Sequence, residues 1–104
     1  MAMFLVEHQH EDATCPAQSP ESAKMMESLV LGTERQRECG VKLVEDCKVS
    51  GEHRLLILVE APERSNAEKY AEPFKMVGKT EVRDLTTCSE FLSRVLSGEA
   101  KGCR

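Results

Sequence analysis

Residues 40–61 read GVKLVEDCKVSGEHRLLILVEA, and this stretch decides the fold. Side chains alternate between two faces over residues 41–49, with the two-residue period of a half-buried strand. Residues 50–52 (SGE) are typical of a turn, and residues 53–61 are the most strand-like segment of the chain. The sequence therefore predicts a β-hairpin that ends at Pro62.

Further elements are expected on both sides of this hairpin. Residues 3–10 are rich in strand formers, and Ser19-Pro20-Glu21 has the N-cap, first-turn proline and first-turn acid of a helix start. After the hairpin, a capping box over residues 65–68 begins a second helix, whose last turns contain Pro73. The remaining expected elements are a short helical piece over 33–38, a polar edge strand over 80–87, and a short helix begun by Thr87 and Glu90.

This order of elements predicts an α+β fold. A βαββαβ chain with right-handed crossovers forms a ferredoxin-like sandwich, with an antiparallel four-stranded sheet in the order 4-1-3-2 and both main helices on one face. We expect one domain over residues 1–96 and a flexible C-terminal tail over 97–104. The two central strands are apolar on both faces, and the helices cover only one face. The sequence therefore predicts a homodimer that packs through the other sheet face.

Composition excludes several classes of function. A net charge of -4, with three phenylalanines, one tyrosine and no tryptophan, disfavours binding of nucleic acid. Residues 1–9 have neither a basic leader nor an apolar run long enough for a signal peptide or a membrane span, so we expect a cytoplasmic protein without membrane association. Five irregularly spaced cysteines in such a compartment are expected to be free thiols.

Several short motifs occur in an order that resembles a known group of proteins. They are FLVEHQH (residues 4–10), TCP (14–16), the hairpin stretch, EPFKMVG (72–78) and TTC (86–88). The chain resembles small bacterial and archaeal proteins of the dimeric α+β barrel superfamily. The resemblance implies a dimeric ferredoxin-like fold but no single activity, since that superfamily includes metal binders, haem-handling and quinol-type oxygenases, and regulatory domains.

The strongest candidate site is a cluster of metal-ligand residues. His8 and His10 lie on one face of the first strand, about 6 to 7 Å apart at Cα. The predicted topology brings His53 to the same end of the sheet, and Cys15 follows shortly after. Imidazole and thiolate suit zinc, nickel or copper, so His8, His10, Cys15 and His53 form the predicted ligand set. A slip of one residue in register would put His53 on the other face, and the alternative is a set of solvated histidines without an ion.

Two other functions stay open. One is an enzyme or carrier of the monooxygenase-like kind, which would bind a small organic ligand in an apolar cavity. Its expected lining is Phe4, Val6, Leu56, Leu58, Tyr70 and Phe74. The other is a regulatory dimerisation module. No Cys-His catalytic signature is present, which favours a protein without enzymatic activity.

The remaining cysteines have simpler interpretations. Cys88 at a helix start has the position of a reactive thiol, yet the topology places it at the end of the sheet opposite the histidines. We interpret it as a small half-buried residue. Cys39 and Cys47 are interpreted as packing residues, and Cys103 as a residue of the tail.

Overall fold

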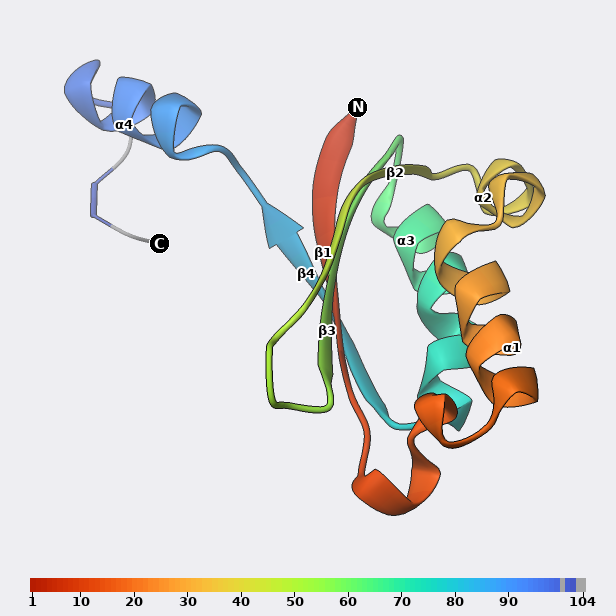
Figure 1. The fold of residues 1–104 in the computed structure, drawn as a ribbon. Helices are drawn as coiled ribbons and strands as arrows, with labels where there is room; N and C mark the ends of the chain where they lie inside the picture. The colour runs from red at the N-terminus through yellow and green to blue at the C-terminus, as the bar shows by residue number, and fades with distance from the viewer. Residues whose placement is uncertain (100, 103–104) are drawn as a thin grey trace.

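The computed structural model describes residues 1–99 and 101–102, and it shows four strands and four α-helices in this part of the chain (Figure 1). The strands are β1 (Ala2–Gln9), β2 (Lys42–Lys48), β3 (Arg54–Ala61) and β4 (Lys79–Leu85). The helices are α1 (Pro20–Leu31), α2 (Thr33–Cys39), α3 (Arg64–Ala71) and α4 (Cys88–Leu96). Three 3₁₀ turns complete the set: η1 (Asp12–Thr14), η2 (Pro16–Gln18) and η3 (Glu72–Met76). Cys103 and part of the predicted tail lie outside the described residues.

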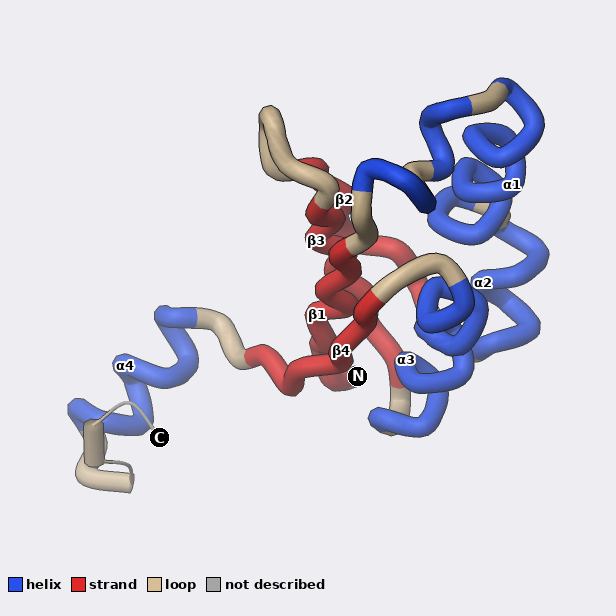
Figure 2. The backbone as a smooth tube through the Cα atoms, turned by 90° about the horizontal axis from the view of Figure 1, so that it is seen from below, coloured by secondary structure: helices blue, strands red, loops and turns tan. Residues whose placement is uncertain are grey.

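The predicted α+β class and the antiparallel sheet are confirmed. The strand order is β2-β3-β1-β4, with every neighbouring pair antiparallel, which reads β4-β1-β3-β2 from the other edge. Helices α1, α2 and α3 cover one face of the sheet, whereas α4 projects from the end of β4 away from them (Figures 1 and 2). None of the described helices has both the length and the apolar character needed to cross a bilayer.

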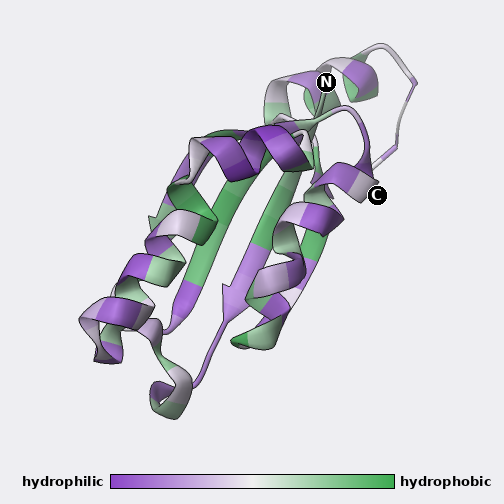
Figure 3. Cartoon of the chain, turned by 90° about the vertical axis from the view of Figure 1, so that its right-hand side faces the viewer, coloured by the Kyte–Doolittle hydropathy of each residue, from purple (hydrophilic) through white to green (hydrophobic). Residues whose placement is uncertain are grey.

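The core lies between the sheet and α3. Alternate residues of β1 and β3 point toward the helices, and the aromatic side chains of Tyr70 and Phe74 fill the space above them without any exposure. Figure 3 views the sheet through the helices and shows its hydrophobic strands behind them. The buried strand residues of β1, β3 and β4 are Phe4, Val6, His8, Ile57, Val59, Ala61 and Val82. His8 is therefore part of the inward face of β1, next to the aromatic core.

The structure corrects the expected face of β2. Strict alternation placed Leu43, Glu45 and Cys47 on one face, but the register shifts between Leu43 and Glu45. Leu43 pairs with Val59 on the helix side, whereas Glu45 pairs with Leu58 on the opposite side. An extra residue at a β-bulge moves every later side chain to the other face, and sequence periodicity alone does not reveal it.

Helix α1 packs loosely. Ser19 caps it as predicted, since its Oγ accepts a hydrogen bond from the Ser22 amide at 3.2 Å. Of its apolar residues, however, only Val30 is buried, and Met25 is 49% exposed. The helix is held mainly at its C-terminal end, where the Tyr70 hydroxyl donates to the Val30 carbonyl at 2.8 Å.

Two further predictions are corrected at α2 and α3. The capping box of α3 uses Glu63 and Asn66, two residues before the expected position, so the helix begins at Arg64. The charged run over residues 34–38 is typical of a solvated helix surface. Arg35 instead lies 4.7 Å from the Tyr70 ring centre and donates to the Leu29 carbonyl at 2.9 Å. Arg35 therefore ties α1, α2 and α3 together over the core.

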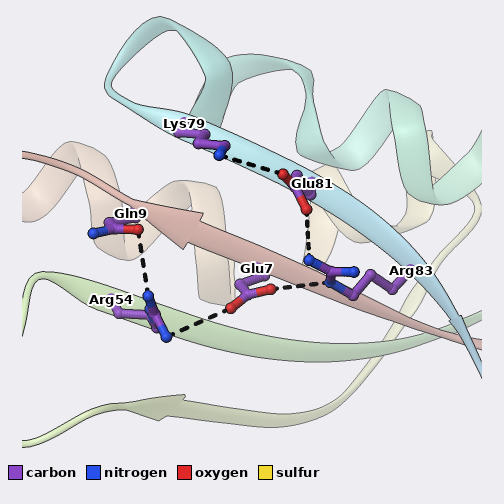
Figure 4. Close-up of a pocket in the computed structure, with 6 residues that line it drawn as sticks. All are labelled: Glu7, Gln9, Arg54, Lys79, Glu81 and Arg83. Carbon is purple, nitrogen blue, oxygen red and sulfur yellow. Dashed lines mark hydrogen bonds and ion pairs between the residues drawn. The ribbon is translucent and has the colours of Figure 1, made fainter.

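The second face of the sheet has no helix over it. Its central side chains are apolar and partly buried; they are Met3, Leu5, Leu56, Leu58 and Leu85. Toward the histidine end the face becomes ionic (Figure 4). There Arg83 binds Glu7 at 3.0 Å and Glu81 at 2.7 Å, and Arg54 lies 3.9 Å from Glu7.

Candidate metal centre

The end of β1 and the start of β3 meet as the topology predicted. Antiparallel pairing runs to Gln9 and Arg54, and the amide of His10 then donates to the carbonyl of His53 at 3.0 Å. The two imidazole rings lie 5.1 Å apart between centres. The prediction that His53 reaches the histidine end of β1 is therefore confirmed.

Three side chains form a group that could hold a metal ion. One donor atom each from His10, Cys15 and His53 lies within 4.8 Å of the other two. A tetrahedral zinc site with bonds of about 2.0 Å to nitrogen and 2.3 Å to sulfur spaces its donors roughly 3.3 to 3.6 Å apart. Side-chain adjustments on the order of an ångström would thus bring the three donors to bonding geometry.

Two buried nitrogen atoms of the group lack hydrogen-bond partners among the residues that the structure describes. They are Nε2 of His10 and Nδ1 of His53. Buried polar atoms in proteins are nearly always paired, and an unpaired one costs about 1 to 3 kcal/mol. The two nitrogens belong to the two imidazoles that face each other beside Cys15, which is the arrangement expected of metal ligands.

The loop after β1 positions Cys15 through its own backbone. The Cys15 amide donates to the carbonyl of Asp12 at 3.3 Å, and the Cys15 carbonyl accepts from Gln18 at 3.2 Å. Pro16 is buried and begins the second 3₁₀ turn. These two consecutive turns reverse the chain and bring the thiol back toward His10.

The group contains three of the four predicted ligands and does not include His8. Both of its ring nitrogens have protein partners: Nδ1 lies 2.9 Å from the Thr80 hydroxyl, and Nε2 lies 3.1 Å from Nδ1 of His10. The prediction that His8 and His10 share a face is correct. His8, however, lies one layer behind His10 in the core and supports it.

The hydrogen-bond chain favours one proton arrangement. If His8 carries its proton on Nδ1, it donates to Thr80 and accepts from Nδ1–H of His10. The Nε2 atom of His10 then keeps a free lone pair on the side of Cys15 and His53. The reverse arrangement leaves an N–H of His10 buried without an acceptor, which is unfavourable. The first arrangement gives His10 the tautomer that a metal ligand requires.

Burial keeps both inner imidazoles neutral. Loss of hydration, with the nearby His10 as a smaller contribution, lowers the pKa of His8 from 6.5 to about 4. Burial also lowers the pKa of His10, followed by the effects of His53 and Lys48. Metal ligation needs the unprotonated ring, so these shifts favour ligation at neutral pH.

Sequence reasoning missed two supporting residues. Asp12 lies 3.4 Å from Nε2 of His53, the nitrogen opposite the one that faces the group. A carboxylate on the outer nitrogen of a metal-bound histidine orients the ring and raises its basicity. Thr80 plays the corresponding part behind His8. Asp12 was within reach of sequence analysis through its nearness to Cys15, whereas Thr80 depends on the register between β1 and β4.

Gly78 allows the chain to pass close behind His10. A Cβ atom added at this glycine would lie 2.9 Å from both Cα and Cβ of His10, and nearer still to the carbonyl oxygen of Gln9. Such contacts are far shorter than van der Waals distance, so any larger residue would displace His10. The turn into β4 thus restricts the position of His10.

The six residues of the expected organic-ligand cavity do not share one surface. Phe4 and Val6 pair with Val59 and Ile57 on the helix side, where Tyr70 and Phe74 also lie, all of them fully or nearly fully buried in close packing. The other two residues, Leu56 and Leu58, pair with Glu7 and Leu5 on the uncovered face.

The other cysteines lie apart from the candidate centre. Cys39 is buried at the end of α2, in line with its interpretation as a packing residue, whereas Cys47 and Cys88 are exposed. Cys88 follows Leu85, which pairs with Met3 at the far end of β1 from His10. In comparisons with known proteins, no family model, curated protein or solved structure matches this chain.

Proposed function

We propose that this protein binds one transition-metal ion of the zinc, nickel or copper class through His10, Cys15 and His53. The observation that carries the proposal is the group itself: three donors within 4.8 Å of one another, two of them from imidazoles whose buried inner nitrogens have no other partner. Two nitrogens and one sulfur are a borderline-soft donor set, which suits these ions better than magnesium or calcium. We assign no catalytic step to the ion.

The surrounding residues support this assignment. His8 and Asp12 hold the outer nitrogens of the two ligand histidines, and the His10–His53 backbone hydrogen bond fixes their spacing. Outer contacts of this kind are typical of protein metal sites. They orient each ring before the ion arrives.

The direct test is metal content and metal titration of protein purified without a histidine tag. We expect about one equivalent of bound ion, lost on treatment with a chelator and restored by titration. The variant Cys15→Ser removes the thiolate ligand and should weaken binding by at least tenfold. Cys88→Ser is the matched control, because it makes the same chemical change in an exposed residue at the opposite end of the sheet.

Two results would overturn the proposal. One is less than roughly a tenth of an equivalent of any transition metal in the purified protein, together with no binding on titration. The other is metal binding that Cys15→Ser and Cys88→Ser weaken equally. Circular dichroism of both variants shows whether the fold is intact, so a loss of binding through unfolding is recognised.

We also propose that a second copy of the chain covers the uncovered sheet face. The five partly buried apolar side chains at its centre form a continuous patch across β3, β1 and β4, which is unusual on the surface of a monomer. The mass of the native assembly tests this. We expect a dimer for the natural chain and a monomer for Leu58→Glu, and a monomeric natural chain would refute the proposal.

A further inference from the structure

A small apolar hollow borders two of the three proposed ligands. It has a volume of about 180 Å³, and His10 and Cys15 form part of its wall. The rest of the wall is made of Pro16, Ala17, Ala23, Met26, Lys48 and Leu55. A second hollow of about 240 Å³ shares Ala23, Met26, Lys48 and Leu55 with it. The two hollows together form a groove that begins at the ligand group and runs between α1 and the β2–β3 side of the sheet.

The groove owes its existence to the loose packing of α1. Ala23 is exposed and Met26 only partly buried, although both lie on the helix face that points toward Leu55. The sheet side chain opposite, Leu55, is also only partly buried. Apolar side chains on both walls are therefore available to a ligand with an apolar part.

The charges at the histidine end of the groove indicate which polar group such a ligand would carry. Three protein donors leave a tetrahedral ion with one further coordination position. Lys48 is the only charged residue of the smaller hollow, and it lies close enough to His10 to act on its charge. A divalent ion and the Lys48 ammonium, offset by the Cys15 thiolate and by the Asp12 carboxylate beside His53, still leave this end of the groove with a net positive charge. An anionic oxygen donor between the ion and Lys48 would balance it.

We propose that the groove binds a small carboxylate with a short aliphatic chain, with the carboxylate on the metal ion and near Lys48 and the chain between Met26 and Leu55. This inference rests on the proposed metal-binding function and deepens it, because it gives the ion an external ligand. A volume of about 180 Å³ equals that of roughly six water molecules, which limits the bound part to a few carbon atoms.

The test uses the cobalt(II)-substituted full-length protein and hexanoate as the probe. Cobalt takes the same donors as zinc and reports its coordination through visible absorption. We expect hexanoate to change this spectrum in a saturable manner. It should bind about fifteenfold more tightly than butanoate, because it has two more methylenes and each buried methylene contributes roughly fourfold. Hexanol, which has the chain without the charge, should leave the spectrum unchanged.

Variants locate the binding site within the groove. Lys48→Met keeps an unbranched aliphatic side chain and removes the charge. The affinity for hexanoate should therefore fall by about threefold or more, while cobalt still binds. Lys42→Met is the matched control at the other end of β2. Met26→Asp places an acid in the groove wall and should abolish the preference for hexanoate over butanoate.

The outcomes separate this inference from the proposed function. If neither cobalt nor zinc, nickel or copper binds, the metal-binding proposal fails and the groove ligand is refuted with it. If cobalt binds but hexanoate leaves its spectrum unchanged, only the groove ligand is refuted. The groove ligand is also refuted if hexanoate binds equally to the natural chain and to Met26→Asp. A third refuting result is a cobalt spectrum that changes in Met26→Leu without added hexanoate, since the Met26 sulfur would then occupy the fourth coordination position.

Discussion

Acid should destabilise the metal-free protein through His8. The ring is fully buried and its pKa is lowered from 6.5 to about 4 by burial and then by His10. In the unfolded chain the ring takes up a proton below about pH 6.5, whereas in the folded chain it stays neutral until about pH 4. The stabilising effect of the neutral ring is therefore complete above the unfolded pKa and is lost as the pH falls between these two values. At about pH 5 the loss is roughly 2 kcal/mol, and below pH 4 it approaches about 3 kcal/mol.

Urea denaturation with a chelator present measures this loss. Free energies of unfolding near pH 7.5 and near pH 5 are compared for the natural chain and for His8→Gln, which does not titrate. The variant is less stable at both pH values because Thr80 and His10 lose a ring partner, so the difference in pH dependence is the informative quantity. We expect the natural chain to lose about 2 kcal/mol more than the variant. Equal losses in both proteins would refute the reasoning.

Three further substitutions test the packing around the site. Tyr70→Phe leaves the Val30 carbonyl without its hydrogen-bond donor. The free energy of unfolding, measured by urea denaturation, should therefore fall by about 1 to 2 kcal/mol. An unchanged value would contradict the buried hydrogen bond. Gly78→Ala pushes on His10 and should lower metal affinity at least tenfold in titration; unchanged affinity would show that His10 is not held as described. Gly51 has a positive φ of 78°, and a Cβ added there would have no neighbour within 4 Å. Gly51→Ala should therefore lower the free energy of unfolding by only about 1 kcal/mol and leave metal affinity unchanged. A drop in metal affinity would contradict a purely local effect.

Strong local signals predicted most of the fold. Ser19 before Pro20, and Thr87 before Glu90, each cap a helix as expected, because the chemistry of a cap lies within four neighbouring residues. The β2 bulge was missed because its cause is non-local: the shift at Leu43 follows from the strand beside it. The cap of α3 was misplaced by two residues because Glu63 and Ser65 both have side chains able to cap a helix.

The candidate site was predictable in its location but not in its roles. Alternation along β1 put His8 and His10 on one face, and the antiparallel hairpin brought His53 to their end of the sheet. The different roles of the two β1 histidines depend on which groups stand beside each ring. His8 lies opposite Thr80 in the β1–β4 register and next to the Phe74 ring at 5.8 Å, and neither neighbour is readable from local sequence.

The metal-free group has an energetic cost that a bound ion would remove. Two buried imidazole nitrogens without partners cost about 1 to 3 kcal/mol each relative to paired ones, and the fold holds both in place through backbone contacts and outer hydrogen bonds. An ion that binds only the folded chain stabilises it by an amount that grows with the logarithm of its concentration above the dissociation constant. Because a bound ion relieves this local cost, the cost adds to the affinity for the ion. The oriented lone pairs also spare the bound state the entropy of ordering two histidines and a cysteine. The order in the core behind His10, from Thr80 through His8, is thus the feature that would prepare this end of β1 for a metal ion.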